Sequence, residues 1–157
     1  MKLSEIARFK YKPCADYFDL RELYDERTYN CFGGNRLANF LNDSAINALL
    51  YIRHTLDVPI TVNNWHVGGQ YKYSGFRPMD VPIGAAASAH KLNMAYDLKF
   101  LGMTPEEAFI ELMKRENTLF YVGVRRIEHL AHTPTWLHFD VLNDIDMKAG
   151  EIKIILP

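Results

Sequence analysis

The sequence predicts a small α+β domain in which helices flank a mainly antiparallel sheet. The chain has 157 residues, of which 48% are hydrophobic, so it is long enough for one compact core and too short for two comfortable domains. Segments 93–98 and 136–141 alternate polar and apolar residues with a period of two, which is typical of strands with two different faces. We therefore expect one domain over residues 1–157, with a lead-in segment at 1–36 and a core at 59–156.

The first half of the chain predicts two helices followed by a strand. A short helix is expected over residues 20–27. Asp43-Ser44 can cap a second helix that continues to about residue 56, because apolar residues recur there at helical spacing. Residues 59–63 are expected to form a strand, and Gly68-Gly69 a turn that brings the chain back.

The middle of the chain predicts a loop and then a well-marked helix. Residues 78–89 are rich in small residues and are expected to form a loop that leads into His90. Thr104 precedes Pro105, and Glu107 follows three residues after the threonine. A threonine cap, a proline in the first turn and a glutamate at the third position predict a helix start with a capping box.

The last third of the chain predicts further strands. Residues 119–124 form an apolar run that we expect to be a strand. Arg125-Arg126 is interpreted as a solvated strand end rather than a binding patch. Residues 128–135 are expected to form a loop at one wall of a cleft, and residues 151–156 a strand that closes the sheet.

Charge and cysteine content exclude several classes of function. The net charge is -1 and the isoelectric point is about 6.6, so we expect no nucleic-acid binding and no attachment to an anionic membrane. Cys14 and Cys31 lack metal-type spacing and are expected to be reduced, buried thiols. The first ten residues lack the apolar stretch of a signal peptide, and no later run is long enough to span a bilayer. Synthesis in a cytoplasm is therefore expected.

Two strand-like segments place polar side chains where they can share a cleft. The period of two puts His138 and Asp140 on one face of their segment and Asp97 on the polar face of the other. Together with His90, the residues His138 and Asp97 supply two imidazoles and a carboxylate, the type of donor set that a catalytic zinc site needs. The spacing differs from the helical His-Glu-x-x-His motif. A histidine on a strand is also often a core or surface residue, so spacing alone leaves both interpretations open.

Four pieces of the sequence occur in an order that few families combine. They are Ser74-Gly75-Phe76-Arg77 at the end of the run 62–77, Gly84, Ser88-x-His90-x-x-Asn93-x-Ala95-x-Asp97, and Trp136-x-His138-x-Asp140. In this combination the chain resembles the zinc D-Ala-D-Ala carboxypeptidase family, which includes phage endolysins and virion-associated peptidoglycan peptidases and has a hedgehog-like core. The family's usual pattern is Ser-Gly-Tyr-Arg, Gly-Gly, Ser-x-His-x-x-Gly-x-Ala-x-Asp and a late His-x-Asp. The resemblance covers roughly residues 60–142, and it implies a hedgehog or D-Ala-D-Ala peptidase-like fold.

The resemblance assigns roles to particular residues. It implies zinc ligands at three positions, which are His90, Asp97 and His138. It implies that Arg77 binds a substrate carboxylate or the developing oxyanion, for which a planar guanidinium is suited. Ser88 is expected to brace the loop or bind substrate. Asp140 is expected to orient a ligand histidine through its other ring nitrogen.

The chain departs from the family pattern at several positions, of which the general base is the most important. Asn93 stands for the usual glycine, and asparagine tolerates the positive φ that a turn can require there. Many members carry a glutamate three residues before the late histidine, where this chain has Thr135. Other members use a histidine five or six residues before it, so His132 is the predicted base or oxyanion stabiliser, with Glu128 and His129 behind it.

The function implied by the resemblance is zinc-dependent hydrolysis of a peptide bond in peptidoglycan, by a D-Ala-D-Ala carboxypeptidase or endopeptidase. The expected cofactor is Zn²⁺, and the expected partner is the stem peptide of bacterial peptidoglycan. A phage-encoded lysin or a virion-associated enzyme is favoured, made in the host cytoplasm without a signal peptide and acting after release or as part of a virion. Virion proteins are then potential partners. The alternative is a structural or binding protein of a virion that keeps this fold with little or no activity.

Overall fold

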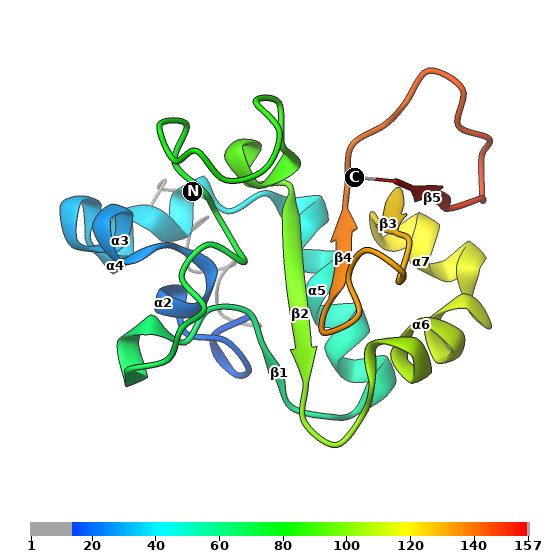
Figure 1. Ribbon diagram of the computed structural model, residues 1–157, viewed down its shortest axis with the longest axis horizontal. Coiled ribbons are helices and arrows are strands. Elements are labelled where there is room, and N and C mark those ends of the chain that lie inside the picture. Colours follow the sequence, from blue (N-terminus) through cyan, green and yellow to red (C-terminus); the bar gives the residue numbers. More distant parts are fainter. Residues whose placement is uncertain (1–13, 157) are drawn as a thin grey trace, which may run out of the picture.

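A twisted sheet runs through the centre of the fold (Figure 1). The structure is a computed structural model that describes residues 14–156. Within that range the sheet has five strands in the order β1-β2-β4-β3-β5. They are β1 (Ile60–Thr61), β2 (Ala95–Phe100), β3 (Arg126–Glu128), β4 (Leu137–Asp140) and β5 (Lys153–Ile155). All neighbouring strands pair antiparallel except β3 and β5, which confirms the expected α+β class.

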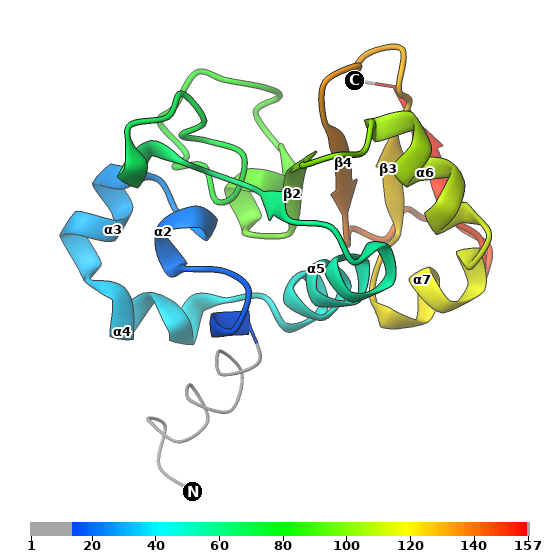
Figure 2. The same cartoon turned by 90° about the horizontal axis from the view of Figure 1, so that it is seen from below.

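Helices pack on one face of the sheet and beside its β1 edge. The helices are α2 (Leu20–Leu23), α3 (Glu26–Phe32), α4 (Gly34–Leu37), α5 (Asp43–Leu56), α6 (Pro105–Met113) and α7 (Glu116–Val122), with 3₁₀ turns η1 (Ala38–Phe40), η2 (Trp65–Val67) and η3 (Ala89–Leu92). In Figure 2, α5 lies along the sheet with α6 and α7 on one side of it, and α2, α3 and α4 gather on the other side. The side chains of Tyr96, Leu98, Leu137 and Phe139 are fully buried in the same core as α5. The opposite face of β2 and β4 is therefore left for the polar residues.

Two of the predicted helices form where the sequence places them. α5 spans Asp43–Leu56, and the side chain of Asn42, one residue earlier than expected, accepts a hydrogen bond from the Ala45 backbone at its start. Thr104 and Glu107 form the predicted reciprocal capping box at the start of α6. Capping side chains satisfy backbone N–H groups that have no partner inside the helix.

The single helix predicted over residues 20–27 is wrong, because the chain breaks it into α2 and α3. Tyr24 is extended, with ψ 155°, and the Asp25 side chain accepts a hydrogen bond from the Thr28 backbone to start α3. The break frees the Tyr24 carbonyl, which accepts hydrogen bonds from the side chains of Asn63 and Trp65. A tertiary contact thus overrides the helical pattern.

The strand predicted over residues 119–124 is also wrong, since most of that run is the helix α7. The buried and half-buried positions Glu116, Leu119, Phe120 and Gly123 recur at helical spacing, and Val122 is also half-buried. Gly123 has φ +127°, and a Cβ there would lie 2.7 Å from the Ser44 carbonyl oxygen. A glycine therefore lets α7 end directly against α5.

The register of the strands fixes which polar residues meet. Asp97 lies opposite His138, and Ala95 lies opposite Asp140, in the antiparallel pair of β2 and β4. On the other side of β4, Arg126 of β3 lies opposite Asp140. Arg126 is therefore paired inside the sheet, and its interpretation as a solvated strand end is wrong.

The remaining expectations concern cysteines, membranes and the amino terminus. Both cysteines are free, as expected, but Cys14 is buried and Cys31 is exposed. Burial raises the pKa of the Cys14 thiol to about 12, with a smaller contribution from the charge of Glu22. None of the helices within residues 14–156 combines the length and the apolar character needed to cross a bilayer. The absence of a signal peptide and part of the lead-in segment concern residues 1–13, which lie outside the described residues.

Candidate metal centre

His90 enters the site from a short turn rather than from a strand. It lies in η3, which follows the loop over residues 78–88, and Asn93 ends this turn with φ +58°. The backbone N–H of Asn93 donates back to the carbonyls of Ala89 and His90. Asparagine is one of the few residues that adopt this left-handed conformation readily. The prediction that Asn93 preserves the turn in place of glycine is confirmed.

The segment Ser74-Gly75-Phe76-Arg77 holds two of the candidate ligands through its backbone. The Gly75 carbonyl lies 2.8 Å from Nδ1 of His90, and the Ser74 carbonyl accepts a hydrogen bond of 2.8 Å from the Asp97 backbone. The Arg77 backbone N–H donates to the His90 carbonyl. A Cβ at Gly75 would lie 2.2 Å from the Leu23 carbonyl oxygen, so only glycine fits this position.

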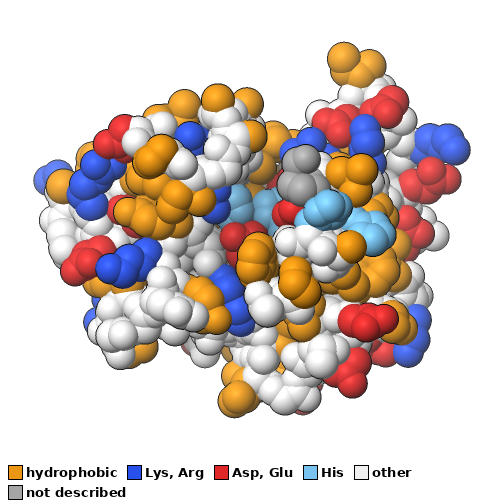
Figure 3. All heavy atoms as spheres, viewed as in Figure 1, with side chains coloured by type: hydrophobic (Ala, Val, Ile, Leu, Met, Phe, Trp, Pro, Cys, Tyr) orange, Lys and Arg blue, Asp and Glu red, His pale blue; other side chains and the backbone are white. Residues whose placement is uncertain are grey.

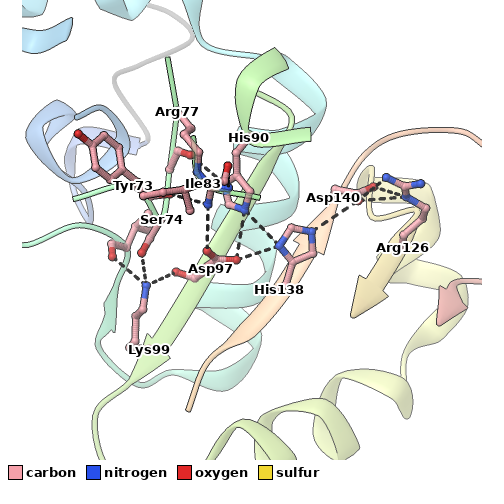
Figure 4. Close-up of polar contacts among 12 residues, drawn as sticks. Tyr73, Ser74, Arg77, Ile83, His90, Asp97, Lys99, Arg126, His138 and Asp140 are labelled. Carbon is pink, nitrogen blue, oxygen red and sulfur yellow. Dashed lines mark hydrogen bonds and ion pairs between the residues drawn. The ribbon is translucent and has the colours of Figure 1, made fainter. Parts of the chain in front are cut away.

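His90, Asp97 and His138 bring three donor atoms together (Figure 4). Nε2 of His90 lies 3.2 Å from Nδ1 of His138 and 3.2 Å from Oδ1 of Asp97, and the last two atoms are 2.8 Å apart. The contact with the Gly75 carbonyl requires a proton on Nδ1 of His90, which leaves a lone pair on Nε2 of the neutral ring. Atoms that bear lone pairs repel at such distances unless a positive charge lies among them. The group therefore needs a proton or a metal ion.

The pKa values of Asp97 and His138 also indicate that this group needs a positive charge. Burial alone would raise the pKa of Asp97, but the charges and hydrogen bonds of the two histidines outweigh it and hold that pKa far below its usual range. Burial alone would lower the pKa of His138, but Asp140 and Asp97 outweigh it and raise that pKa to about 9. A proton on His138 or a metal ion would supply this charge.

Asp140 supports His138 from the side away from the cluster. Its Oδ2 lies 3.6 Å from Nε2 of His138, while both carboxylate oxygens accept hydrogen bonds from the guanidinium of Arg126 at 2.8–3.0 Å. The Asp140 carboxylate is 1% exposed. Burial would raise its pKa, but His138 and Arg126 lower it, so it stays ionised. This geometry leaves Nδ1 of His138 to face the other two donors.

Arg77 lies on the opposite side of the cluster and is largely engaged by the protein. Its Nη1 donates to the Ile83 carbonyl at 3.1 Å and its Nη2 to the Tyr73 carbonyl at 3.0 Å, with Oδ2 of Asp97 at 3.9 Å. Its side chain is 8% exposed. A guanidinium has five N–H donors, so these two hydrogen bonds leave others for a ligand. A Cβ at Gly84 would lie 2.6 Å from Nη1 of Arg77, which explains the glycine there.

Two adjoining hollows flank the cluster. A hollow of about 460 Å³ is lined by His90, Asp97 and His138 together with Arg126 and Glu128, and it is called the metal-side pocket below. A second hollow of about 380 Å³ extends from Asp97 and Arg77 towards Lys99. In Figure 3, histidine side chains lie in a depression of this face with acidic and basic side chains beside them. A substrate could therefore reach the donor atoms.

The structure brings most of the predicted site residues together. Ser88 and Glu128 line the metal-side pocket. His132 is exposed, stacks edge-on against His129 and is not among the residues that line that pocket. Glu128, rather than His132, therefore lines the hollow that contains the donor atoms.

Sequence reasoning missed three residues that shape this region. Arg126 clamps Asp140, and Trp136 lines both hollows. Lys99 donates to Ser74 Oγ, to the Asp97 carbonyl at 3.1 Å and to the Val62 carbonyl at 3.3 Å. Burial lowers the pKa of Lys99 to about 8, against the opposing effect of Asp97. The alternation of β2 places Lys99 on the same face as Asp97, and this signal could have identified it.

Comparisons with protein-family models, with curated proteins and with solved structures gave no match to this chain. What the site can do therefore depends on its own geometry and on the motifs in the sequence. Both point to a buried group of two imidazoles and one carboxylate that can hold a metal ion beside an open pocket.

Proposed function

We propose that the protein is a zinc-dependent hydrolase that cuts a peptide bond in the stem peptide of bacterial peptidoglycan. The observation that carries the metal site is the convergence of His90 Nε2, Asp97 Oδ1 and His138 Nδ1 within 2.8–3.2 Å. The peptide substrate rests on the motifs shared with the zinc D-Ala-D-Ala carboxypeptidase family. Cleavage as a carboxypeptidase or as an endopeptidase is compatible with the same donor set.

Zinc fits the donor atoms in type and in spacing. Two imidazole nitrogens, one carboxylate oxygen and one open position are typical of catalytic zinc. Zinc–ligand bonds of about 2.0–2.1 Å in a tetrahedron separate neighbouring donors by about 3.3 Å, close to the 3.2 Å between His90 Nε2 and His138 Nδ1. Two histidines and a carboxylate also bind iron in some oxygenases. Metal analysis must therefore test iron beside zinc.

The residues around the pocket have distinct tasks in this proposal. A bound zinc ion would supply an activated water and polarise the scissile carbonyl. Glu128 forms no ion pair within residues 14–156 and lines the metal-side pocket, so its carboxylate can accept a proton from water and return it to the leaving amine. The free N–H groups of Arg77 can bind the substrate's carboxylate or carbonyl oxygen. Asp140 holds the His138 ring in the orientation that ligation needs.

The alternative proposal is a virion structural or binding protein that keeps the site without useful turnover. One observation favours it, because Arg77 already donates to the Tyr73 and Ile83 carbonyls and is almost fully buried. A substrate-binding arginine is expected to have more guanidinium N–H groups free to bind the substrate. The missing glutamate at Thr135 points in the same direction.

The deciding experiment combines metal analysis with digestion of purified peptidoglycan. The wild type should hold one zinc per chain and release peptide fragments that mass spectrometry identifies, whereas His138→Ala should lose both properties. Glu128→Gln should retain zinc and lose most turnover, and His132→Gln should retain both. A wild type that binds zinc yet cuts no wall preparation would support the structural alternative. Preferential binding of iron would overturn the assignment to a zinc hydrolase.

A further inference from the structure

A separate hollow of about 710 Å³ lies beside α3 and α4. These two helices are at the left of Figure 1. The walls of this hollow come from α3, α4, η1, η3 and the segment 76–79, and it is called the apolar pocket here. The side chains of Phe32, Phe40, Met79 and Leu92 line it and are 52–67% exposed. Clusters of exposed apolar side chains of this kind commonly mark binding sites. The volume falls in the range of about 300–1,000 Å³ that is usual for small-molecule sites.

A buried amide in the wall of the apolar pocket lacks one partner. Asn93 lines the pocket and is 8% exposed. Its Nδ2 donates to the Tyr24 hydroxyl at 3.1 Å and to the Phe40 carbonyl at 2.6 Å, but its Oδ1 has no hydrogen-bond partner within residues 14–156. A buried acceptor without a donor costs free energy. A ligand that brings an N–H or O–H group would remove this cost.

The charge of the apolar pocket is positive. Arg27 and Lys91 line it, and among residues 14–156 no aspartate or glutamate does. Arg27 is engaged by Asp80 at 2.5–2.8 Å, whereas Lys91 forms no ion pair with any residue that the structure describes. Residues 1–13 carry four basic side chains and one acidic side chain, so this segment of the chain does not complement the pocket. An anionic ligand does.

We propose that the apolar pocket binds a small amphipathic carboxylate, with an apolar body, one N–H or O–H donor and one negative charge. Phe32, Phe40 and Leu92 contact the apolar body, Asn93 Oδ1 accepts from the donor, and Lys91 pairs with the carboxylate. N-acyl amino acids combine these three features. The pocket contains none of the residues of the metal centre, so this proposal is independent of the proposed function.

Cys31 provides a native reporter for ligand binding. It is exposed and lines the apolar pocket, whereas Cys14 is fully buried. The reaction of the full-length protein with a chromogenic disulfide reagent therefore follows Cys31. N-decanoylglycine should slow this reaction saturably, by fivefold or more. Two analogues isolate the polar contacts, since N-decanoylglycinamide lacks the charge and N-decanoylsarcosine lacks the N–H.

The proposal predicts which of the three compounds binds most tightly and where on the protein they bind. Each analogue should bind roughly three- to tenfold more weakly than N-decanoylglycine. Lys91→Glu should weaken binding to a similar extent, and the matched control Lys148→Glu, on the far segment 146–153, should not. Backbone NMR shifts should centre on α3, η1 and η3. Absence of protection up to the solubility limit, equal binding of the glycinamide, or shifts that centre elsewhere would overturn the proposal.

Discussion

Asp140→Asn tests whether the buried carboxylate sets the orientation of His138, the proposed ligand. Oδ1 of Asp140 accepts hydrogen bonds from Arg126 Nε and from the Leu142 backbone, while Oδ2 accepts from Arg126 Nη2 and faces His138 Nε2. Every one of these neighbours is a donor when Nδ1 of His138 faces the metal. Asparagine offers only one oxygen, so its NH₂ group must face donors whichever way the amide is turned.

Both orientations of the amide have a calculable cost. If the NH₂ group faces Leu142, one backbone donor and one guanidinium donor lose their acceptor, at about 1–3 kcal/mol for each buried group. If it faces His138, the imidazole is driven to carry its proton on Nδ1, which is the nitrogen required for the metal. Loss of such a supporting contact typically weakens metal binding by about ten- to hundredfold. We therefore expect a weaker zinc affinity in that range and a lower free energy of unfolding.

The assay is competition for zinc with a chromophoric chelator, alongside urea unfolding of the metal-free protein. Asp144→Asn is the matched control, because Asp144 contacts Arg126 at 3.2 Å and is not among the residues around His138. The control should keep the zinc affinity within about twofold, as expected for a partly exposed ion pair. Wild-type affinity in Asp140→Asn would refute the argument that Asp140 orients His138.

Three further variants separate the supports of the site. Gly84→Ala places a Cβ 2.6 Å from Arg77 Nη1 at a residue with φ +71°. The free energy of unfolding in urea should therefore fall by about 1–2 kcal/mol, while metal analysis should show that zinc is retained. An unchanged free energy of unfolding would contradict the close contact. Lys99→Met removes the hydrogen bonds to the Ser74 side chain and the Asp97 carbonyl. It should weaken zinc binding roughly tenfold in the chelator assay, and an unchanged zinc affinity would reject this prediction. Thr104→Ala removes the capping box of α6. It should lower the free energy of unfolding in urea by about 1 kcal/mol without changing the zinc affinity. A large loss of zinc would show that α6 supports the site more directly than its position suggests.

The pairing of Asp97 with His138 could be predicted because strands have a strict period of two. Once the polar faces of 93–98 and 136–141 are assigned, an antiparallel pair can bring both side chains onto one surface. The register with Asp97 opposite His138 confirms this reasoning. The position of His90 could not be obtained in the same way, since it depends on a 3₁₀ turn and on the Gly75 carbonyl. Long-range backbone contacts leave no periodic signal in the sequence.

The failed predictions share a physical cause. Residues 119–124 are apolar enough for a strand, but contacts of α7 with α5 and the glycine at 123 select a helix. Arg125 and Arg126 look equivalent in the sequence, yet the register of β3 turns only Arg126 towards Asp140, while Arg125 donates to the Phe120 carbonyl and to Asn143. Tertiary context decides both outcomes, and a single sequence does not display it.

Contacts outside the cluster hold the donor residues of the candidate metal centre in place. A buried carboxylate such as Asp140 must find a cation, and Arg126 holds it so that it faces His138 Nε2. The Gly75 carbonyl holds His90, and the Ser74 carbonyl holds the Asp97 backbone. Because each candidate ligand is fixed by a contact outside the cluster, the three donor atoms converge on one point. If an ion binds at this site, little free energy is lost to rearrangement of the donors, as a preorganised functional site requires.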